Sequence, residues 1–499
     1  MAFLPPIGDA LSIRPITLDA LRRVAFLLAT MLLGSSAALL VPLAIAAGYG
    51  ETAVVKAFAV TFFIAAAAGA GGYFLFRTDL SRLTRREGFA VVALSWALIC
   101  FVGSLPFVFA GALSPLNAWF ECTSGFTGTG SSVIADIEAL PHGILFWRSF
   151  THWLGGMGFV VLYIALYPLL GIGAMQLYRA EVPGPEKDRL RPRLRSTARI
   201  LWLVYLILSV ALTVLLLLGG MDLFEAVCQM FGAIGTGGFS TRNDSIAGFH
   251  SAYIDWVIVI FIWLAATNFS LHWAVLTGRP GRLLKNPEWR FYTLNLAVLS
   301  VIVSLLVWTS TEASFGTSVR EGVFAVVSMG TCTGFALGDY ELWAPLAQYL
   351  IFLLLFIGGC AGSTAGAIKV IRVQIFSKQA LRGIFRTVHP HAVAPPRLGE
   401  KAVTGEMLRS VFSFIGLYLL TWALFSAGMS LTGMDFATAT SSVATAMGGV
   451  GPGLGEVGPF DNYDWVHPAG KAMLTFCMLA GRLELFTVVL LFSPVYWRR

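Results

Sequence analysis

Four short glycine-rich segments recur along the chain, and their residue types point to more specific chemistry than any other feature of the sequence. Each lies between apolar runs. Backbone without side chains can approach a central axis closely, and a ring of carbonyl oxygens can replace the hydration shell of a cation. We therefore predict a cation site built from four loops. The segments read Phe126-Thr127-Gly128-Thr129-Gly130-Ser131, Ile234-Gly235-Thr236-Gly237-Gly238-Phe239, Thr331-Cys332-Thr333-Gly334-Phe335 and Gly448-Gly449-Val450-Gly451-Pro452-Gly453.

The spacing of these segments predicts a fourfold repeat. We take Gly130, Gly237, Gly334 and Gly451 as equivalent, which gives gaps of 107, 97 and 117 residues (237 − 130, 334 − 237, 451 − 334). Such gaps are too long for a solenoid unit but fit a membrane hairpin repeated four times. Irregular backbone persists at membrane depth only where protein buries it or a water-filled cavity borders it.

The composition is that of a polytopic membrane protein. The 499 residues are 57% hydrophobic and 12% charged, whereas a soluble protein is roughly a quarter charged. We read the first apolar run as a retained anchor, because it is too long for the core of a cleaved signal peptide. Ten runs are long enough to cross a bilayer: Val24–Ala47, Ala53–Phe76, Gly88–Ala112, Ile144–Leu170, Ile200–Gly219, Tyr253–Leu276, Phe291–Ser310, Trp343–Val370, Leu408–Leu431 and His467–Phe492.

The basic residues are concentrated in alternate connections, so their distribution indicates how the chain is oriented in the membrane. The net charge of +7 is therefore not a sign of nucleic-acid binding. Positive-inside bias predicts that both termini are cytoplasmic, which an even number of spans allows. The glycine segments fall on the acidic, external side. An acidic vestibule would concentrate cations, although acidic residues also collect there by default. The basic connections are Arg22-Arg23, Arg77 to Arg86, Arg179 to Arg199, Arg279 to Arg290, Lys369 to Arg409 and Arg498-Arg499.

We expect an all-α polytopic membrane protein with four pseudo-repeated membrane–pore-loop–membrane units around one pore, plus two N-terminal transmembrane helices. The expected division is 1–86 for the helix pair, then 87–198, 199–289, 290–406 and 407–499 for the repeats. Each repeat contains a helix too short to span the membrane, whose C-terminal carbonyls would face a central cation. These helices are predicted at Leu116–Gly125, Leu223–Ala233, Val319–Gly330 and Phe436–Met447.

The second span of each repeat is interrupted by small or polar residues. The third carries the run Gly358–Gly366, which predicts either a broken segment able to cross the pore or a kinked packing helix. Asn268 and Arg482 share one offset from their glycines (268 − 237 = 31 and 482 − 451 = 31). A charge as deep as Arg482 needs a partner or water. It forms either a salt bridge with a carboxylate or an electrostatic barrier beneath the filter.

Together these motifs resemble the Trk/Ktr/HKT superfamily of potassium transporters, most closely its TrkH-type pore subunits, over essentially the whole chain. The two leading spans look like the extra pair of that subunit type. The residues that carry the resemblance are His152-Trp153-Leu154-Gly155-Gly156-Met157-Gly158, Thr236-Gly237-Gly238-Phe239-Ser240-Thr241, Gly359-Cys360-Ala361-Gly362-Ser363-Thr364, Val450-Gly451-Pro452-Gly453 and Gly481-Arg482-Leu483-Glu484.

The resemblance implies a bacterial cytoplasmic-membrane homodimer with one pore per protomer, in contact with lipid and regulated by a cytosolic ring of nucleotide-binding TrkA-type subunits. The chain has no phosphate-binding motif of its own, so nucleotide control needs that partner. No cofactor is expected, and K+ is the transported ion. Cys332 and Gly128 depart from the family's commoner residues. The implied potassium filter is Thr129, Gly130, Thr236, Gly237, Thr333, Gly334, Val450 and Gly451. The implied gating residues are Gly359, Gly362, Ser363, Thr364, Gly366 and Arg482.

Three functions are compared. The first is gated potassium uptake, and the second is a sodium-permeable or proton- or sodium-coupled symporter of the same superfamily. Glycine in all four filter segments favours potassium. The third is a membrane enzyme, for which His152, Glu484 and Asp136 are the candidates, but they are scattered and no nucleophile or metal motif accompanies them. The six cysteines have no metal-binding spacing and are expected to be small buried residues.

Overall fold

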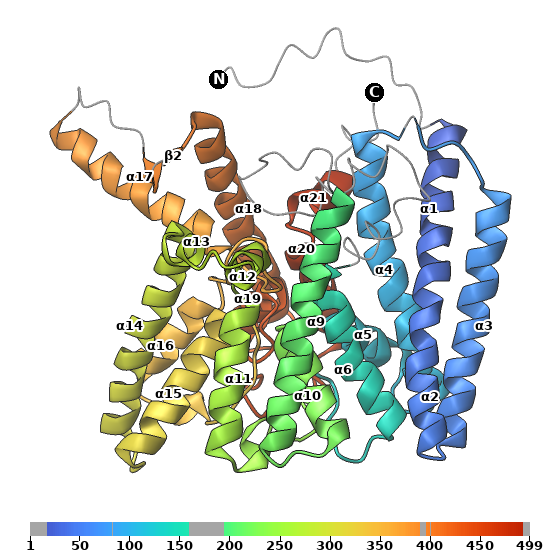
Figure 1. Ribbon diagram of the computed structural model, residues 1–499, viewed down its shortest axis with the longest axis horizontal. Helices are drawn as coiled ribbons and strands as arrows, with labels where there is room; N and C mark the ends of the chain where they lie inside the picture. The colour runs from blue at the N-terminus through green and yellow to red at the C-terminus, as the bar shows by residue number, and fades with distance from the viewer. Residues whose placement is uncertain (1–16, 82, 159–193, 390–395, 400, 493–499) are drawn as a thin grey trace, which may run out of the picture.

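The computed structural model describes residues 17–81, 83–158, 194–389, 396–399 and 401–492, and these are almost entirely helical. Most helices stand side by side and upright in Figure 1. Several predicted features fall partly outside the described residues: the fourth span beyond residue 158, the basic connection that begins at Arg179, and the terminal Arg498-Arg499.

The N-terminal pair forms one edge of the molecule. Its first span comprises α1 (Leu18–Ser36), the short η1 (Ala37–Leu39) and α2 (Leu40–Gly48), and its second span is α3 (Thr52–Leu75). The pair packs on α4 (Arg85–Phe109), the first helix of repeat 1. In the apolar stretch of α4, 61% of residues are buried, against 28% in α18 (Gly405–Ser430), the matching helix of repeat 4. The pair therefore shields repeat 1 from lipid.

Four short helices lie where the sequence predicts them: α5 (Pro115–Thr127), α10 (Leu223–Ile234), α15 (Phe315–Gly330) and α19 (Phe436–Gly448). We call them the pore helices. Each begins after Ser or Asp, residues that favour helix starts. The predicted start of the third, Val319, is wrong by four residues, because the Ser314 hydroxyl caps an earlier turn by accepting from the Thr317 N–H at 3.2 Å.

The interior tolerates the polar pore helix α19 because its hydroxyls bond to nearby carbonyls. In α19 all residues from Thr438 to Gly448 are buried. Thr440 Oγ1 donates to the Phe436 carbonyl at 2.7 Å, and Thr445 Oγ1 donates to the Ser442 carbonyl at 2.9 Å. Satisfied hydroxyls of this kind can be buried at little cost.

The outer helices of the repeats differ between first and second spans. The first are continuous: α4, α9 (Leu194–Leu218), α14 (Pro287–Ser310) and α18. The second begin at α6 (His142–Gly156), α11 (Ala252–Ala265), α16 (Pro345–Leu354) and α20 (Pro468–Arg482). Continuation helices follow three of these as α12 (Phe269–Leu276), α17 (Val370–Val388) and α21 (Phe486–Phe492).

The breaks in the second spans lie at the interruptions that the sequence indicated. The bend is 102° between α11 and α12 and 120° between α20 and α21. Asn268 and Arg482, which share one sequence offset, both lie at such breaks. Among the described residues, six helices are long and apolar enough to span a membrane, or eight if each bent pair is one span. Of the ten predicted spans, the other two are the fourth and the eighth, which is interrupted after α16.

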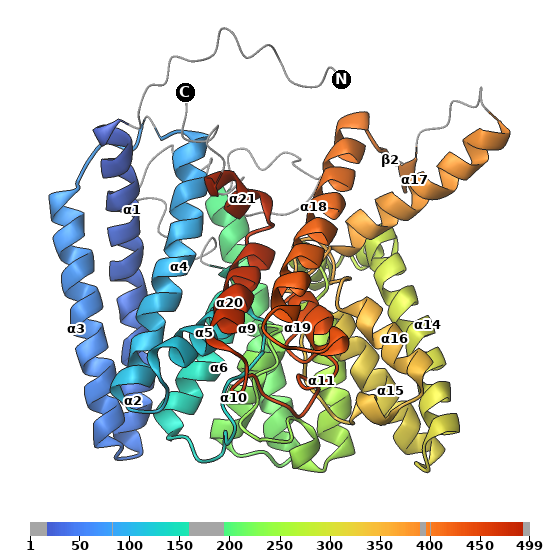
Figure 2. The same ribbon diagram turned by 180° about the vertical axis from the view of Figure 1, so that it is seen from behind.

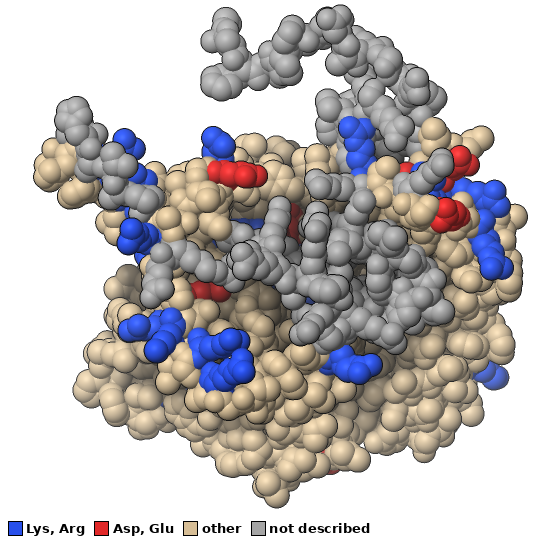
Figure 3. All heavy atoms as spheres, turned by 45° about the horizontal axis from the view of Figure 1, so that its top comes forward, with Lys and Arg blue, Asp and Glu red and all other residues tan. Residues whose placement is uncertain are grey.

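The remaining elements are small. They are η3 (Ala247–Phe249), α13 (Gly281–Leu284), η4 (Tyr340–Leu342) and an antiparallel pair of two-residue strands, β1 (Arg397–Leu398) and β2 (Lys401–Ala402). Figures 1 and 2 show that α1 begins and α21 ends at the same face. Figure 3 turns that face forward, with Lys and Arg side chains scattered over it and few Asp or Glu. This is the face that the sequence predicts to be cytoplasmic.

Candidate ion pathway

Each pore helix ends in the same backbone pattern. A left-handed residue comes first, with φ of 70° at Gly128, 50° at Thr236, 57° at Cys332 and 67° at Gly449. Two residues later comes a glycine with positive φ, which is 86° at Gly130, 83° at Gly238, 78° at Gly334 and 99° at Gly451. The N–H between them donates to the carbonyl five residues earlier, in the bonds Thr129 to Ser124 (2.9 Å), Gly237 to Gly232 (2.8 Å), Thr333 to Ser328 (2.8 Å) and Val450 to Thr445 (3.1 Å).

This pattern corrects the predicted alignment of repeat 2. Gly238, not Gly237, is equivalent to Gly130, Gly334 and Gly451, so the first two gaps become 108 and 96 residues (238 − 130 and 334 − 238). Gly237 instead occupies the position of Thr129, Thr333 and Val450. The error arises because the repeat 2 segment contains several glycines, so the motif alone does not show which of them is equivalent to Gly130. The residue at which the pore helix ends decides this alignment.

The four glycines close into a ring. A Cβ added to Gly130 would collide with the Gly237 carbonyl oxygen, and one added to Gly238 would collide with that of Thr333. Likewise Gly334 abuts the Val450 carbonyl, and a Cβ at Gly451 would lie 2.9 Å from the Thr129 oxygen. Every repeat thus contacts the next, and repeat 4 returns to repeat 1. Carbonyl oxygens from all four repeats lie at these contacts, where side chains have no room.

A polar vestibule of about 670 Å³ opens onto this ring. All four glycines line it, together with residues of the connections that follow them, among them Ser132, Asn243 and Asp461. An ion in the vestibule therefore reaches the carbonyl ring directly. Such an arrangement can exchange water ligands of a cation for backbone oxygens.

An extended segment, residues 355–369, lies on the other side of the ring between α16 and α17. Its two arms meet in a parallel bridge, in which the Gly358 N–H donates to the Ile368 carbonyl at 3.1 Å. Gly366 abuts the carbonyl of Gly448, the last residue of pore helix α19. The segment is not a kinked helix, and it reaches the start of the fourth glycine segment.

Arg482 fastens this segment to two other repeats. Its guanidinium donates to the Thr364 carbonyl at 2.9 Å, to the Gly156 carbonyl at 3.1 Å and to the Gly155 carbonyl. A Cβ added to Gly128 would lie 3.9 Å from Arg482 Nη1, which places the charge directly below the first glycine segment. The nearby Glu484 pairs instead with Arg372 at 2.8 Å.

The other predicted gating residues are held from repeats 2 and 3. The Phe269 N–H donates to the Gly362 carbonyl at 3.1 Å, and Thr364 Oγ1 donates to the Ala265 carbonyl at 3.2 Å. Gly359 lies against Ala266, and Ser363 Oγ closes a local turn on the Cys360 carbonyl at 2.6 Å. The structure therefore brings Gly359, Gly362, Ser363, Thr364, Gly366 and Arg482 into one layer beneath the ring.

His152 is a residue whose place the sequence did not predict. Its buried ring occupies the space into which a side chain at Gly237 would project, and its Nδ1 lies 2.7 Å from the Gly125 carbonyl oxygen. The ring centroid is 4.0 Å from that of Phe239. Its neighbour on α6, Arg148, forms an ion pair with Glu121. The sequence signal that could have drawn attention to this helix is the presence of two charged residues, Glu121 and Arg148, within the apolar part of one repeat.

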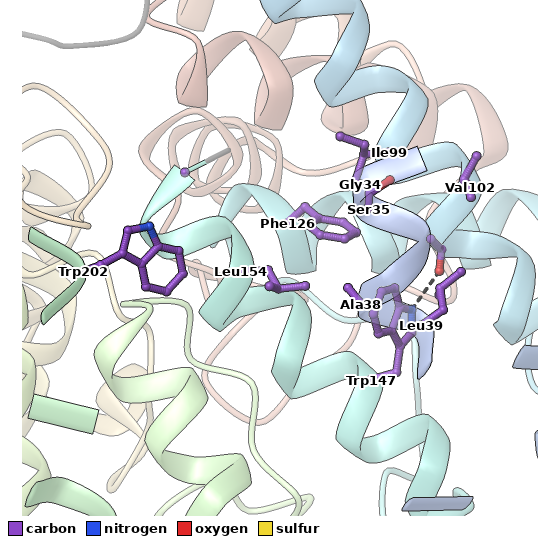
Figure 4. A pocket seen from close by; sticks show the side chains of 12 residues that line it. Gly34, Ser35, Ala38, Leu39, Ile99, Val102, Phe126, Trp147, Leu154 and Trp202 are labelled. Carbon is purple, nitrogen blue, oxygen red and sulfur yellow. Dashed lines mark hydrogen bonds between the residues drawn. The ribbon is translucent and has the colours of Figure 1, made fainter. Parts of the chain in front are cut away.

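An apolar pocket lies behind the first pore helix, between the N-terminal pair and repeat 1 (Figure 4). Phe126 and Leu39 are among its lining residues. Trp147 also lines it, and its indole N–H donates to the Gly103 carbonyl at 2.8 Å, which ties α6 to α4. Gly103 itself lies tightly against Cys122 and Phe126. The lining is largely apolar, which does not suit a hydrated cation, so this pocket is not a second ion route.

The family comparison decides the class of the protein. The sequence pattern of the TrkH family, described as cation transport proteins, matches residues 54–499. The chain belongs to the TrkH family. The membrane-enzyme interpretation is thereby excluded, because the members of this family are transporters. All six cysteines are buried and free, and the described residues contain no group of three or more His, Cys, Asp or Glu side chains suited to a metal ion.

Individual TrkH relatives match nearly end to end. The Trk system potassium uptake protein TrkH of Escherichia coli strain K12 is 40% identical over 484 residues, covering 96% of this chain and 99% of the relative. The TrkH of Halomonas elongata is 39% identical over 486 residues, covering 96% and 100%. The crystal structure of the potassium transporter TrkH from Vibrio parahaemolyticus superposes with a TM-score of 0.87 at 35% identity, covering 96% of this chain and all of that one.

Proposed function

We propose that this membrane protein takes up potassium ions through the carbonyl ring. The closure of Gly130, Gly238, Gly334 and Gly451 into one cyclic set of contacts carries the proposal. Close-packed glycines leave backbone oxygens and no side chains at the contacts between repeats, and such oxygens suit a monovalent cation. The names of the relatives, Trk system potassium uptake proteins, support potassium as the ion.

We further propose that residues 355–369 are the gate. The segment lies beneath the ring and carries the Arg482 contact, so it would obstruct ions without changing the carbonyl ring itself. Lys369 and Arg372 follow at its end and lead into α17, which slants away from the bundle in Figure 1. A cytosolic nucleotide-binding partner of the TrkA type could displace the gate by pulling on α17. The assembly is a homodimer in a bacterial cytoplasmic membrane, with both termini cytoplasmic.

The test is ion flux through the purified full-length protein in liposomes. We expect potassium flux and a reversal potential that follows the potassium gradient in mixed potassium and sodium. Gly238→Ser should lower the potassium-to-sodium permeability ratio, because Gly238 needs positive φ and close approach to Thr333. Gly416→Ser is the matched control, since a Cβ at this glycine of α18 meets nothing within 4 Å.

The outcomes separate the candidates. A reversal potential that follows sodium, or that shifts with a proton gradient, would favour the sodium-permeable or coupled symporter. An unchanged ratio in correctly folded Gly238→Ser would remove the ring from the selective site. Absence of any flux above that of empty liposomes would contradict the proposal as a whole.

A further inference from the structure

Glu121 and Arg148 form an ion pair buried behind the outer half of the carbonyl ring. Arg148 Nε donates to Glu121 Oε1 at 2.6 Å, and the two side chains are 2% and 0% exposed. Glu121 lies in pore helix α5 and Arg148 in α6. Removing two charges from solvent costs several kcal/mol per ion unless further hydrogen bonds compensate. The other partners of this pair therefore show what it holds in place.

Those partners are the segments that leave the ring in two adjacent repeats. Glu121 accepts from the Val133 N–H and from Ser132 Oγ, both at 2.9 Å. Arg148 Nη1 donates to the Ser240 carbonyl at 2.8 Å, and its guanidinium carbon lies 3.7 Å from the centre of the Phe239 ring. Ser132 and Ser240 each lie two residues beyond the ring glycine of their repeat. One ion pair thus links the exits of repeats 1 and 2.

An internal comparison shows that this position has a consistent role. Glu121 precedes Gly130 by nine residues, and Gln229 precedes Gly238 by nine (130 − 121 and 238 − 229). Gln229 Nε2 donates to Ser240 Oγ at 2.8 Å and to Thr241 Oγ1 at 3.3 Å. An uncharged residue therefore suffices to brace one exit. The Glu121–Arg148 pair differs from Gln229 in that it connects two repeats, because Glu121 binds the exit of repeat 1 and Arg148 binds the exit of repeat 2.

Helix α6 is a rigid support for this link. Trp147 anchors it to α4 on one side, whereas Arg148 faces the filter. His152 is one turn beyond Arg148, on the same helix face. It packs against Phe239 and behind Gly237. Movement of Arg148 and its helix would therefore displace the second filter segment at several contacts.

We propose that Glu121 and Arg148 are positioning residues for ion selectivity, which rests on the proposed potassium function. Their link sets the separation between the first and second filter segments. A loosened ring adapts to a smaller ion, because selectivity depends on the size and stiffness of the carbonyl cage. Weakening the link changes discrimination between potassium and sodium, beyond any effect on stability.

Two variants of the full-length protein test this proposal. Glu121→Asp retains the charge but withdraws the carboxylate by one methylene, so it cannot reach Arg148 and Val133 together. The double variant Glu121→Gln with Arg148→Gln removes both charges and leaves neither buried alone. In both we expect the potassium-to-sodium permeability ratio, from reversal potentials in liposomes, to fall by at least about fivefold, equivalent to about 1 kcal/mol. Potassium flux should persist.

Controls distinguish positioning from general stability. The double variant Arg23→Gln with Glu87→Gln removes a mostly buried ion pair of 2.8 Å between α1 and α4. We expect it to lower the thermal midpoint without changing the ratio. Ser132→Ala removes one hydroxyl that donates to Glu121, so it folds even if the other variants do not, and it should lower the ratio about twofold.

The outcomes separate this inference from the proposed function. A wild-type protein without preference for potassium would remove the proposed function itself. A selective wild type, together with an unchanged ratio in Ser132→Ala and in every Glu121 variant that folds, would overturn the positioning role alone. In that case the pair is a structural brace.

Discussion

At the scale of single residues, the second filter segment differs most from the others. Thr129, Thr333 and Val450 bear side chains where repeat 2 has Gly237, and the ring of His152 occupies the vacant space. The left-handed position before it is held by Thr236, with φ of 50°, although this conformation favours glycine. Repeat 2 thus reaches the shared backbone path with a different distribution of side chains.

A double substitution tests this register. Gly237→Ser should reduce potassium flux, because its side chain collides with His152, and the added change His152→Ala should restore much of that flux by clearing the space. Gly238→Ser should not be rescued, since it meets the Thr333 carbonyl and keeps an unfavourable φ. Liposome flux and permeability ratios measure both effects. Equal rescue at the two positions would contradict the assigned register.

Arg482 allows a second prediction at this scale. Arg482→Ala should raise cation flux several-fold, because a like charge about 4 Å from the ion path costs about 1 kcal/mol in water and more in a less polar cavity. The substitution also releases the carbonyls of Thr364 and Gly156. Arg482→Lys keeps the charge but not the planar guanidinium, so its flux should lie between that of the wild type and that of Arg482→Ala. Lower flux from folded Arg482→Ala would show that the residue is structural.

The sequence predicted which glycines share one backbone position, but not the spatial partners of some residues. Motif spacing selected Gly130, Gly334 and Gly451, which occupy equivalent positions in the ring, and Arg482, which lies beneath it. It missed Gly238, because the end of a helix is set by hydrogen bonds that a run of glycines does not reveal. It also missed Glu121 and Arg148, whose pairing depends on the packing of α5 against α6.

At the scale of elements, hydrophobic runs and turn residues predicted the pore helices to within a few residues at each end. They did not predict the sharp bends of the second spans. The angle between α20 and α21 depends on left-handed Glu484 and Leu485, whose φ values are 57° and 47°, rather than on glycine or proline. Tertiary contacts, here the ion pair of Glu484 with Arg372, accompany that geometry.

The extended segment itself supports a prediction at this scale. Deleting Ala361–Ala365 should raise flux, leave the potassium-to-sodium ratio intact and weaken dependence on a cytosolic partner. The deletion removes the Thr364 carbonyl that Arg482 binds and the bond to Ala265, while the carbonyl ring keeps its own contacts. Thr364→Val, which removes only the hydroxyl, should have a smaller effect. A folded deletion that conducts no faster than wild type would show that the segment is packing rather than gate.

The contact between α17 and the α20–α21 bend allows a further prediction. Arg372 Nη2 lies 2.8 Å from Oε2 of Glu484, which is two residues beyond Arg482, and the two side chains are 11% and 26% exposed. Arg372→Gln and Glu484→Gln should each raise flux by about two- to fivefold, since a partly exposed pair is worth about 1 kcal/mol at most. The double variant should add little, because both changes break one contact. Fully additive effects would mean that the residues act separately.

At the scale of the whole molecule, the helices form one bundle with a basic face opposite the pore-helix entrances. The described chain begins with α1 and ends with α21 at this face (Figures 1 and 2). We expect reporter proteins fused to either terminus to be active in the cytoplasm, and a reporter inserted beside Glu312 to be external. Activity of the two terminal fusions on opposite sides would contradict the orientation.

The ring of four glycines is made by one chain, and this has a consequence for how such a pore can change. In a channel assembled from four identical subunits, every mutation appears four times around the axis. Here each quarter is encoded separately, and repeat 1 already carries a charged brace where repeat 3 has Ala325 (334 − 9). Mutation can therefore alter the ring a quarter at a time, so ion preference can drift in small steps while the other three quarters keep their backbone geometry.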